Sequence, residues 1–192
     1  MLRQFAFKFP IALSFLLTLM MAPMTDTHAE TPVDLENTLY LDLKDGRVVI
    51  EMRPDLAPKH VARIKELVRE GFYDGIVFHR VIGGFMAQTG DPTGTGGGGS
   101  GQNLPAEFSD EDHVRGTVSM ARRGGDINSA DSQFFIVFAR SRHLDNQYSV
   151  WGKVTDGMSA VAKIERGDQS RGGMVDNPDS IIRMQVAADV KE

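Results

Sequence analysis

The chain has 192 residues, of which 41% are hydrophobic, and this suits one domain with a substantial core. Its formal net charge of −5 argues against nucleic acid and against anionic membrane surfaces as partners. The absence of cysteine excludes disulfides, thiol catalysis and lipid attachment at a cysteine.

The first 29 residues have the organisation of a secretory signal peptide. Arg3 and Lys8 supply positive charge, an apolar run follows at 11–22, and a polar stretch ends at the small residue Ala29. A membrane-spanning helix needs about 20 apolar residues, so the run is too short for stable membrane insertion, although an uncleaved anchor is the alternative. We therefore expect export to the periplasm, or secretion in a cell without an outer membrane. The predicted organisation is 1–29 signal peptide, 30–37 flexible leader and 38–192 a single domain.

The rest of the sequence alternates short strand patterns with turns. A helix opened by Pro58 and stopped by Gly71 follows the first two strands, and a second short helix is expected at 156–164. Many short strands and two distant helices predict a mainly β fold, a closed antiparallel barrel with helices over its ends. The predicted strands are 38–43, 48–52, 76–81, 85–88, 116–120, 134–138, 149–154 and 181–190.

The glycine-rich segment 94–101 formally contains a dinucleotide-binding pattern at Gly94, Gly96 and Gly99. That pattern must open a helix, whereas Pro105 follows shortly after, and no Lys-Ser/Thr pair is present to bind phosphate. A nucleotide-binding enzyme is therefore rejected. We interpret the segment as a flexible surface loop beside a site.

Most catalytic chemistries lack their residues here. His60, His79, His113 and His143 have no metal-ligand spacing, no nucleophile elbow is present, and no carboxylate pair lies in the apolar strands. We expect no metal and no cofactor. What remains is Arg80, a charge inside an apolar run, which is either paired with a distant carboxylate or faces a cleft and acts on a ligand.

An arginine among aromatic, Met and Gln side chains suits a reaction that needs neither nucleophile nor proton shuttle. Rotation about the peptide bond before proline is such a reaction, since its barrier of about 18–20 kcal/mol comes from amide resonance. An apolar pocket for the proline ring and a guanidinium donating to the prolyl nitrogen would weaken that resonance.

Four motifs resemble those of the cyclophilins, a family of peptidyl-prolyl cis-trans isomerases. They are the segments 78–91, 132–136, 144–145 and 151–154, and the similarity extends from about 38 to 167. The resemblance implies a closed eight-stranded antiparallel β-barrel capped by two α-helices. It also implies that the ligands are proline-containing segments of unfolded or folding proteins.

The resemblance assigns roles to single residues. Arg80 would be the catalytic guanidinium, with Gln88 and Gln133 holding it and the substrate backbone through hydrogen bonds. Ala121 and Arg122 lie on the loop whose backbone meets the substrate in the family. The walls of the proline pocket would be Phe85, Met86, Phe135 and Leu144, with Phe85 counted among the catalytic group.

Three departures from the family pattern bear on ligands. His143 stands where cyclosporin-sensitive members carry Trp, so we expect weak cyclosporin binding with isomerisation largely kept. Tyr148 stands where many eukaryotic members carry His, and it keeps an aromatic wall. The loop 122–131 is longer than in small eukaryotic members, which predicts a different side-chain preference before proline.

Two hypotheses follow. The first is an exported isomerase, expected to be a monomer, that assists the folding of exported proteins by turning bonds before proline. The second is a chaperone module on the same barrel that holds proline-containing segments with little turnover. Substitution of Arg80 separates the two, because only the first requires its guanidinium.

Overall fold

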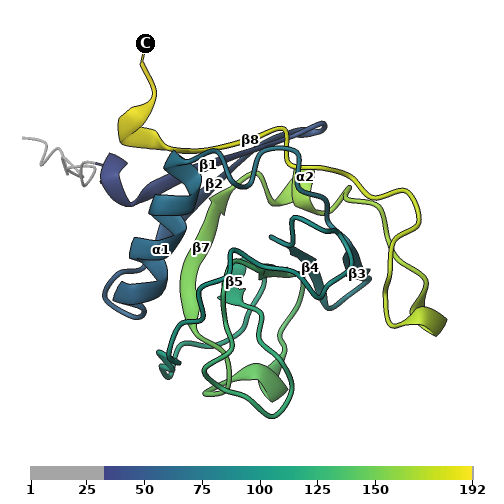
Figure 1. Ribbon diagram of the computed structural model, residues 1–192. Coiled ribbons are helices and arrows are strands. Elements are labelled where there is room, and N and C mark those ends of the chain that lie inside the picture. The colour runs from purple at the N-terminus through teal and green to yellow at the C-terminus, as the bar shows by residue number, and fades with distance from the viewer. Residues whose placement is uncertain (1–32, 192) are drawn as a thin grey trace, which may run out of the picture. The chain divides into compact units, whose positions relative to one another are not determined.

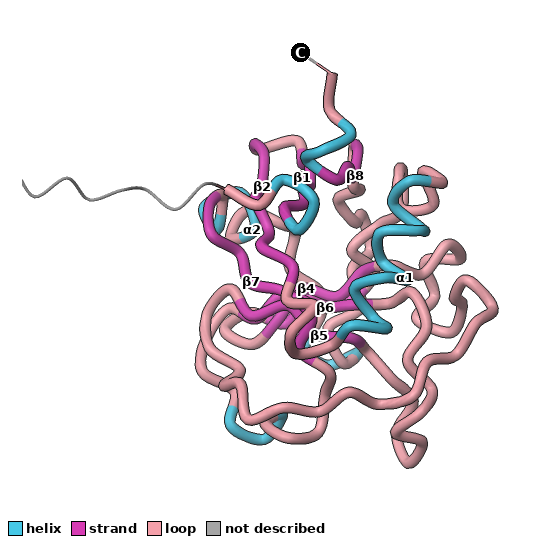
Figure 2. Tube along the Cα trace, turned by 90° about the vertical axis from the view of Figure 1, so that its left-hand side faces the viewer, coloured by secondary structure: helices cyan, strands magenta, loops and turns pink. Residues whose placement is uncertain are grey.

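The structure is a computed structural model, and it describes residues 33–191; the predicted signal peptide lies outside them. Eight strands form one antiparallel sheet with the order β3-β4-β6-β5-β7-β2-β1-β8 (Figures 1 and 2). Figure 2 shows β1, β2 and β8 together at the top and β4, β5 and β6 below, joined through β7. The strands are β1 (Thr38–Leu43), β2 (Gly46–Met52), β3 (Arg80–Ile82), β4 (Met86–Thr89), β5 (Thr117–Met120), β6 (Phe134–Val137), β7 (Val150–Asp156) and β8 (Arg183–Val186).

The sheet is curled but open, so the prediction of a closed barrel was wrong. Strands β3 and β8 are the two ends of the sheet and do not pair with each other. The segment 167–181 passes between them and bonds at single points, as where Val81 N donates to Gly173 O at 2.8 Å and Ile181 N to Ile76 O at 2.9 Å. Because Gly172 and Gly173 both have positive φ, this segment cannot continue a regular ladder.

Most predicted strands are found, with the patterns that predicted them. Leu39 and Leu41 alternate into the core with no exposed surface, and β1 turns into β2 at Lys44 and Asp45. The stretch predicted as a strand at 76–81 is regular only from Arg80. The predicted flexible leader ends in an ordered 3-10 turn, η1 (Leu35–Asn37), capped by the Asp34 carboxylate.

Helix α1 (Pro58–Arg69) begins at the predicted proline, and Figure 1 shows it lying along the sheet near β7. Proline fits the first turn because its missing N–H would have no partner there. The carboxylate of Glu107 accepts from the next two backbone N–H groups, those of Lys59 and His60, at 3.0 and 3.1 Å. The buried face of the helix consists of His60, Val61, Ile64, Leu67 and Val68.

Two elements near the C-terminus are shorter than predicted. Helix α2 (Met158–Val161) is a single turn, after which Lys163 N and Ile164 N donate three residues back, to the carbonyl oxygens of Ala160 and Val161, at 3.0 and 3.3 Å. The Arg166 guanidinium then donates to the carbonyl oxygens of Ala162 and Ile164 at 2.8 and 2.9 Å. Strand β8 ends at Val186, and the chain turns into the 3-10 helix η4 (Ala187–Asp189), where Asp189 is bound by Arg69 of α1.

Side-chain alternation in β4 and β6 divides the apolar residues into two clusters. Ala87, Phe134 and Ile136 point into the main core. Met86 and Phe135, their neighbours along the strands, point to the opposite face of the sheet. There they form a second, smaller cluster with Val137 and Leu144, against which Ile82, Phe85, Ala121 and Tyr148 pack while still partly exposed. A strand that is apolar on both faces therefore carries a site on its outer face.

Within residues 33–191, no helix is long and apolar enough to cross a membrane.

Candidate active site

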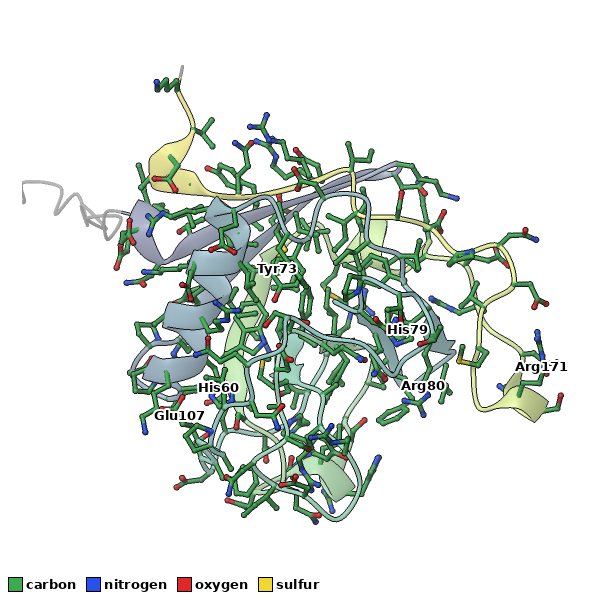
Figure 3. The ribbon with its side chains drawn as sticks, in the orientation of Figure 1. His60, Tyr73, His79, Arg80, Glu107 and Arg171 are labelled. Carbon is green, nitrogen blue, oxygen red and sulfur yellow. The ribbon has the colours of Figure 1, made fainter. Side chains whose placement is uncertain are left out.

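Arg80 lies on β3 directly opposite Gln88 on β4, at the edge of the second apolar cluster. Its Nε donates to the carbonyl oxygen of Gly172 at 2.9 Å, and its Nη1 donates to Gln88 Oε1 at 3.1 Å. No carboxylate among residues 33–191 lies within 4.0 Å of the guanidinium, so the ion-pair interpretation is not realised. Arg80 is half-buried, and Figure 3 shows its side chain next to His79 at this end of the sheet.

The polarity of the hydrogen bonds that start at Arg80 is fixed. A guanidinium only donates, so Gln88 must present its oxygen to Arg80 and its Nε2 to the other side. That Nε2 donates to Gln133 Oε1 at 2.9 Å. Gln133 therefore directs its own Nε2 outward, to the carbonyl oxygens of Gly98 at 2.8 Å and Gly96 at 3.0 Å. Both amides are thus oriented by the charge of Arg80.

The glycine-rich loop ends this chain of bonds and forms a wall beside it; the loop was predicted to be flexible, but hydrogen bonds hold it in one conformation. Its carbonyls are held in place because two carboxylates bind its N–H groups, Asp91 at one end and Asp131 at the other. Burial acts to raise the pKa of Asp91, but the hydrogen bonds from Thr93, Gly96 and Gly98 outweigh it and lower the pKa to about 2. The loop, Ala121, Arg122 and Gln133 line a hollow of about 240 Å³.

The residues predicted to wall the proline pocket come together in the second apolar cluster. Phe135 lies edge-on to Tyr148, with ring centroids 5.6 Å apart, and the exposed His143 packs against Phe85 at 5.1 Å. Of the four predicted wall residues, Met86, Phe135 and Leu144 belong to this cluster and Phe85 packs against it. Ala121 and Tyr148 also pack against the cluster, and His143 contacts it through Phe85.

The two predicted loop residues border the cluster. Ala121 N donates to the carbonyl oxygen of Gln133 at 2.9 Å, which extends the sheet by one bond beyond β5. The Arg122 guanidinium lies 4.7 Å above the Tyr148 ring, and its Nε donates to Gln147 O at 3.0 Å. Arg122 therefore stacks on one side of the pocket and does not compete with Arg80 for its centre.

The site combines a cationic donor with an adjoining apolar surface. Burial lowers the pKa of Arg80 from its usual value, and Tyr148 opposes this effect. A guanidinium remains charged at physiological pH even so. Residues 33–191 contain no group of three side chains that could hold a metal ion. The arrangement can therefore bind a small apolar ring and donate hydrogen bonds to an atom beside it.

Sequence reasoning missed three polar residues beneath this pocket: the buried His113 and Ser119, and the partly exposed Asp145. They form a connected set of hydrogen bonds that touches Phe135 and Tyr148. The available signal was the position of Asp145 within a motif, directly after the pocket residue Leu144. The carbonyl of Gly172, which holds Arg80, was also missed, because a backbone acceptor 92 residues away leaves no mark in the sequence.

Comparisons with known proteins identify the family of the chain. Residues 38–186 match the model of the family described as cyclophilin type peptidyl-prolyl cis-trans isomerase/CLD. A probable peptidyl-prolyl cis-trans isomerase of Brucella suis is 56% identical over 171 residues, which are 82% of this chain and 86% of the relative. Peptidyl-prolyl cis-trans isomerase B of Bacillus subtilis is 43% identical over 134 residues, which are 68% of this chain and 92% of the relative.

Solved structures give the same result. The crystal structure of cyclophilin AquaCyp293 from Hirschia baltica superposes with a TM-score of 0.73 at 30% identity, over 83% of this chain and 77% of that one. A cyclophilin type peptidyl-prolyl cis-trans isomerase of Cryptosporidium parvum, crystallised in the presence of the dipeptide Ala-Pro, gives a TM-score of 0.70 at 29% identity. That superposition covers 78% of this chain and 98% of the other.

Proposed function

The chain belongs to the cyclophilin-type peptidyl-prolyl cis-trans isomerases, and from this premise we propose that it catalyses isomerisation at Arg80 and the adjoining apolar cluster. The observation that carries the assignment of the site is the Arg80 guanidinium beside that cluster, which has no carboxylate partner among residues 33–191 and is oriented by Gln88 and Gly172. The proline ring would occupy the space between Phe85 and Phe135, with the prolyl nitrogen within reach of Arg80.

The chemistry follows from amide resonance. A hydrogen bond donated to the prolyl nitrogen localises its lone pair and gives the C–N bond more single-bond character, so the carbonyl on its other side can turn. An uncatalysed bond turns in tens of seconds, and acceleration to about 10³ s⁻¹ requires about 7 kcal/mol. In this scheme Gln133 and the Ala121–Arg122 backbone hold the substrate chain while the proline ring stays fixed.

Proline-containing segments of unfolded or folding proteins are the proposed ligands. The Cryptosporidium parvum relative was crystallised in the presence of Ala-Pro, and this supports a dipeptide-sized recognition element here as well. We further propose that the natural substrates are exported proteins that fold in the periplasm, and that the enzyme acts as a monomer. The signal-peptide pattern of residues 1–29 supports the compartment.

A refolding assay tests the proposed role. Wild type should accelerate the slow, proline-limited phase of a refolding protein, whereas Arg80→Ala should not. An Arg183→Ala control alters an exposed arginine on β8, at the other end of the sheet, and should behave as wild type. If Arg80→Ala still suppresses aggregation without accelerating the slow phase, the chain has a chaperone activity independent of isomerisation.

The proposed compartment has its own test. After expression in a two-membrane bacterium, the mature protein in the periplasmic fraction should begin at Glu30 by N-terminal sequencing. Recovery of the full-length chain in the cytoplasmic fraction would contradict export while leaving the isomerase assignment intact.

A further inference from the structure

His113 is a buried histidine that joins two parts of the pocket without facing it. Its side chain has no exposed surface. Ring Nδ1 lies 3.2 Å from Asp145 Oδ1, and ring Nε2 lies 2.9 Å from the hydroxyl oxygen of Ser119. Ser119 is itself fully buried in β5.

The protonation of this set can be deduced. The Arg140 guanidinium binds both oxygens of Asp145, at 3.0 and 2.6 Å, so that carboxylate is ionised and only accepts. His113 must then carry its proton on Nδ1, and Nε2 accepts from the Ser119 hydroxyl. Burial lowers the pKa of His113, whereas Asp145 opposes this effect. The connectivity is that of a hydrolytic triad, but Ser119 has no exposed surface at which a substrate could be attacked.

Residue 113 also fixes the turn that carries one wall of the pocket. The 3-10 helix η2 (Arg142–Leu144) holds His143 and Leu144. On its N-terminal side, Ser141 N donates to the carbonyl oxygen of His113 at 2.8 Å. On its C-terminal side, Asp145 accepts from both the backbone N–H and the ring of His113. The turn is therefore held at both flanks by one residue.

The opposite wall rests on the same ring. Phe135 stacks on His113 with a centroid distance of 6.3 Å and an interplanar angle of 23°, and Tyr148 meets the ring edge-on at 6.5 Å. Ser119, which bonds to the ring, is also the direct β5 partner of Phe135 on β6. His113 thus contacts, through its two nitrogens and its face, the supports of Phe135 and of Leu144.

We propose that His113 is a positioning residue for the isomerase, which sets the separation of the Phe135 and Leu144 walls through Ser119 and Asp145. The proposal rests on the assignment of those walls as the proline pocket. Because His113 does not contact the space in which the peptide bond turns, its loss should weaken substrate binding more than it slows the bound substrate.

His60 provides a matched control. Its backbone N–H and ring Nδ1 also donate to one carboxylate oxygen, that of Glu107, at 3.1 and 2.7 Å, and its side chain is equally buried. Figure 3 shows His60, on helix α1, next to Glu107 and away from Arg80. A general loss of stability should affect the His60 and His113 variants alike, whereas a loss of positioning should affect only the latter.

The experiment measures Kd and the bound-state exchange rate of an Ala-Pro peptide by NMR line shape, for His113→Phe, Ser119→Ala and His60→Phe. We expect Kd to rise roughly fivefold in His113→Phe and in Ser119→Ala, the change that corresponds to the net contribution of one hydrogen bond. The exchange rate of the bound peptide should stay within about twofold of wild type. A variant that combines His113→Phe and Ser119→Ala should bind the peptide no more weakly than His113→Phe alone, since both substitutions break the same hydrogen bond. Ser119→Ala removes a single hydroxyl, so it provides the test if His113→Phe does not fold.

The ring itself provides a second measurement. In ¹⁵N spectra of wild type, His113 should show a protonated Nδ1 and an unprotonated Nε2, and the Nε2 resonance should shift on saturation with the peptide while that of His60 does not. An unchanged Kd in Ser119→Ala together with an unmoved Nε2 resonance would overturn the proposal. Phe135→Ala separates failure of the His113 proposal from failure of the proposed function. If Phe135→Ala leaves Kd unchanged, the assignment of the proline pocket itself has failed.

Discussion

The orientation of Arg80 by Gln88 leads to a quantitative prediction. Gln88→Ala removes the acceptor of Arg80 Nη1 and the donor to Gln133 Oε1 in one step. A hydrogen bond to a charged group contributes about 1.5–3 kcal/mol. If that energy serves to hold the guanidinium against the prolyl nitrogen, kcat/KM should fall by about 10- to 100-fold at 1.36 kcal/mol per decade.

A second variant separates the two bonds. Gln88→Glu keeps an acceptor for Arg80 and strengthens it by charge, but it cannot donate to Gln133. Gln133 would then have to turn its amide toward the new carboxylate and release the carbonyls of Gly96 and Gly98. We therefore expect Gln88→Glu to lose less activity than Gln88→Ala and to change the chemical shifts of the glycine-rich loop.

The assay is catalysed cis-trans exchange of a short Ala-Pro peptide by NMR, at equal concentrations of folded protein. Gln185→Ala is the control, because Gln185 is also half-buried but lies on β8, at the other end of the sheet. A kcat/KM for Gln88→Ala within twofold of wild type would refute the reasoning, since Arg80 would then be held well enough by Gly172 alone.

Three other predictions concern stability and inhibition. Burial lowers the pKa of His60, His79 and His113, so below about pH 6.5 the unfolded chain binds protons that the folded chain does not. The free energy of unfolding should therefore fall as the pH drops from 7 to 5, by up to about 1.4 kcal/mol per pH unit for each histidine. Urea titrations at pH 7, 6 and 5 measure this, and equal midpoints would contradict it. Gly90→Ala should lower the free energy of unfolding by about 2–5 kcal/mol, because φ is positive and a Cβ would overlap the Ser132 carbonyl oxygen. Gly84→Ala has a positive φ but open space around the new Cβ, so it should lower the free energy of unfolding clearly less in the same titration. Cyclosporin should inhibit the wild-type enzyme weakly and the His143→Trp variant more strongly. A nanomolar inhibition constant for wild type would contradict the first expectation.

Local patterns predicted much of the fold and of the site. The alternation of β1 and the proline at the start of α1 each specify an element through neighbouring residues. The pairing of Arg80 with Gln88, which the resemblance implied, is present because the turn between β3 and β4 places the two residues opposite each other. Phe85, Met86, Phe135 and Leu144 were named through the motif resemblance; the structure brings them together, and their role as pocket walls stays a prediction.

What failed depends on contacts between distant segments. Closure of the sheet is decided where the segment around Gly172 and Gly173 meets β3, and no periodicity in either segment reports that meeting. The role of His113 depends on Asp145, 32 residues further along the chain, and on Ser119, which looks like an ordinary strand residue. Buried polar connections of this kind have no periodic signal, so they become visible only once the chain is folded.

The most direct test of the catalytic assignment is the exchange rate of the Ala-Pro peptide with Arg80→Ala beside wild type and Arg183→Ala. If the guanidinium weakens the amide resonance, Arg80→Ala should lose about 10²- to 10³-fold in catalysed exchange, the usual cost of removing one preorganised donor, while its folded fraction stays high and Arg183→Ala matches wild type. Catalysed exchange by folded Arg80→Ala at the wild-type rate would show that Arg80 does not carry the reaction.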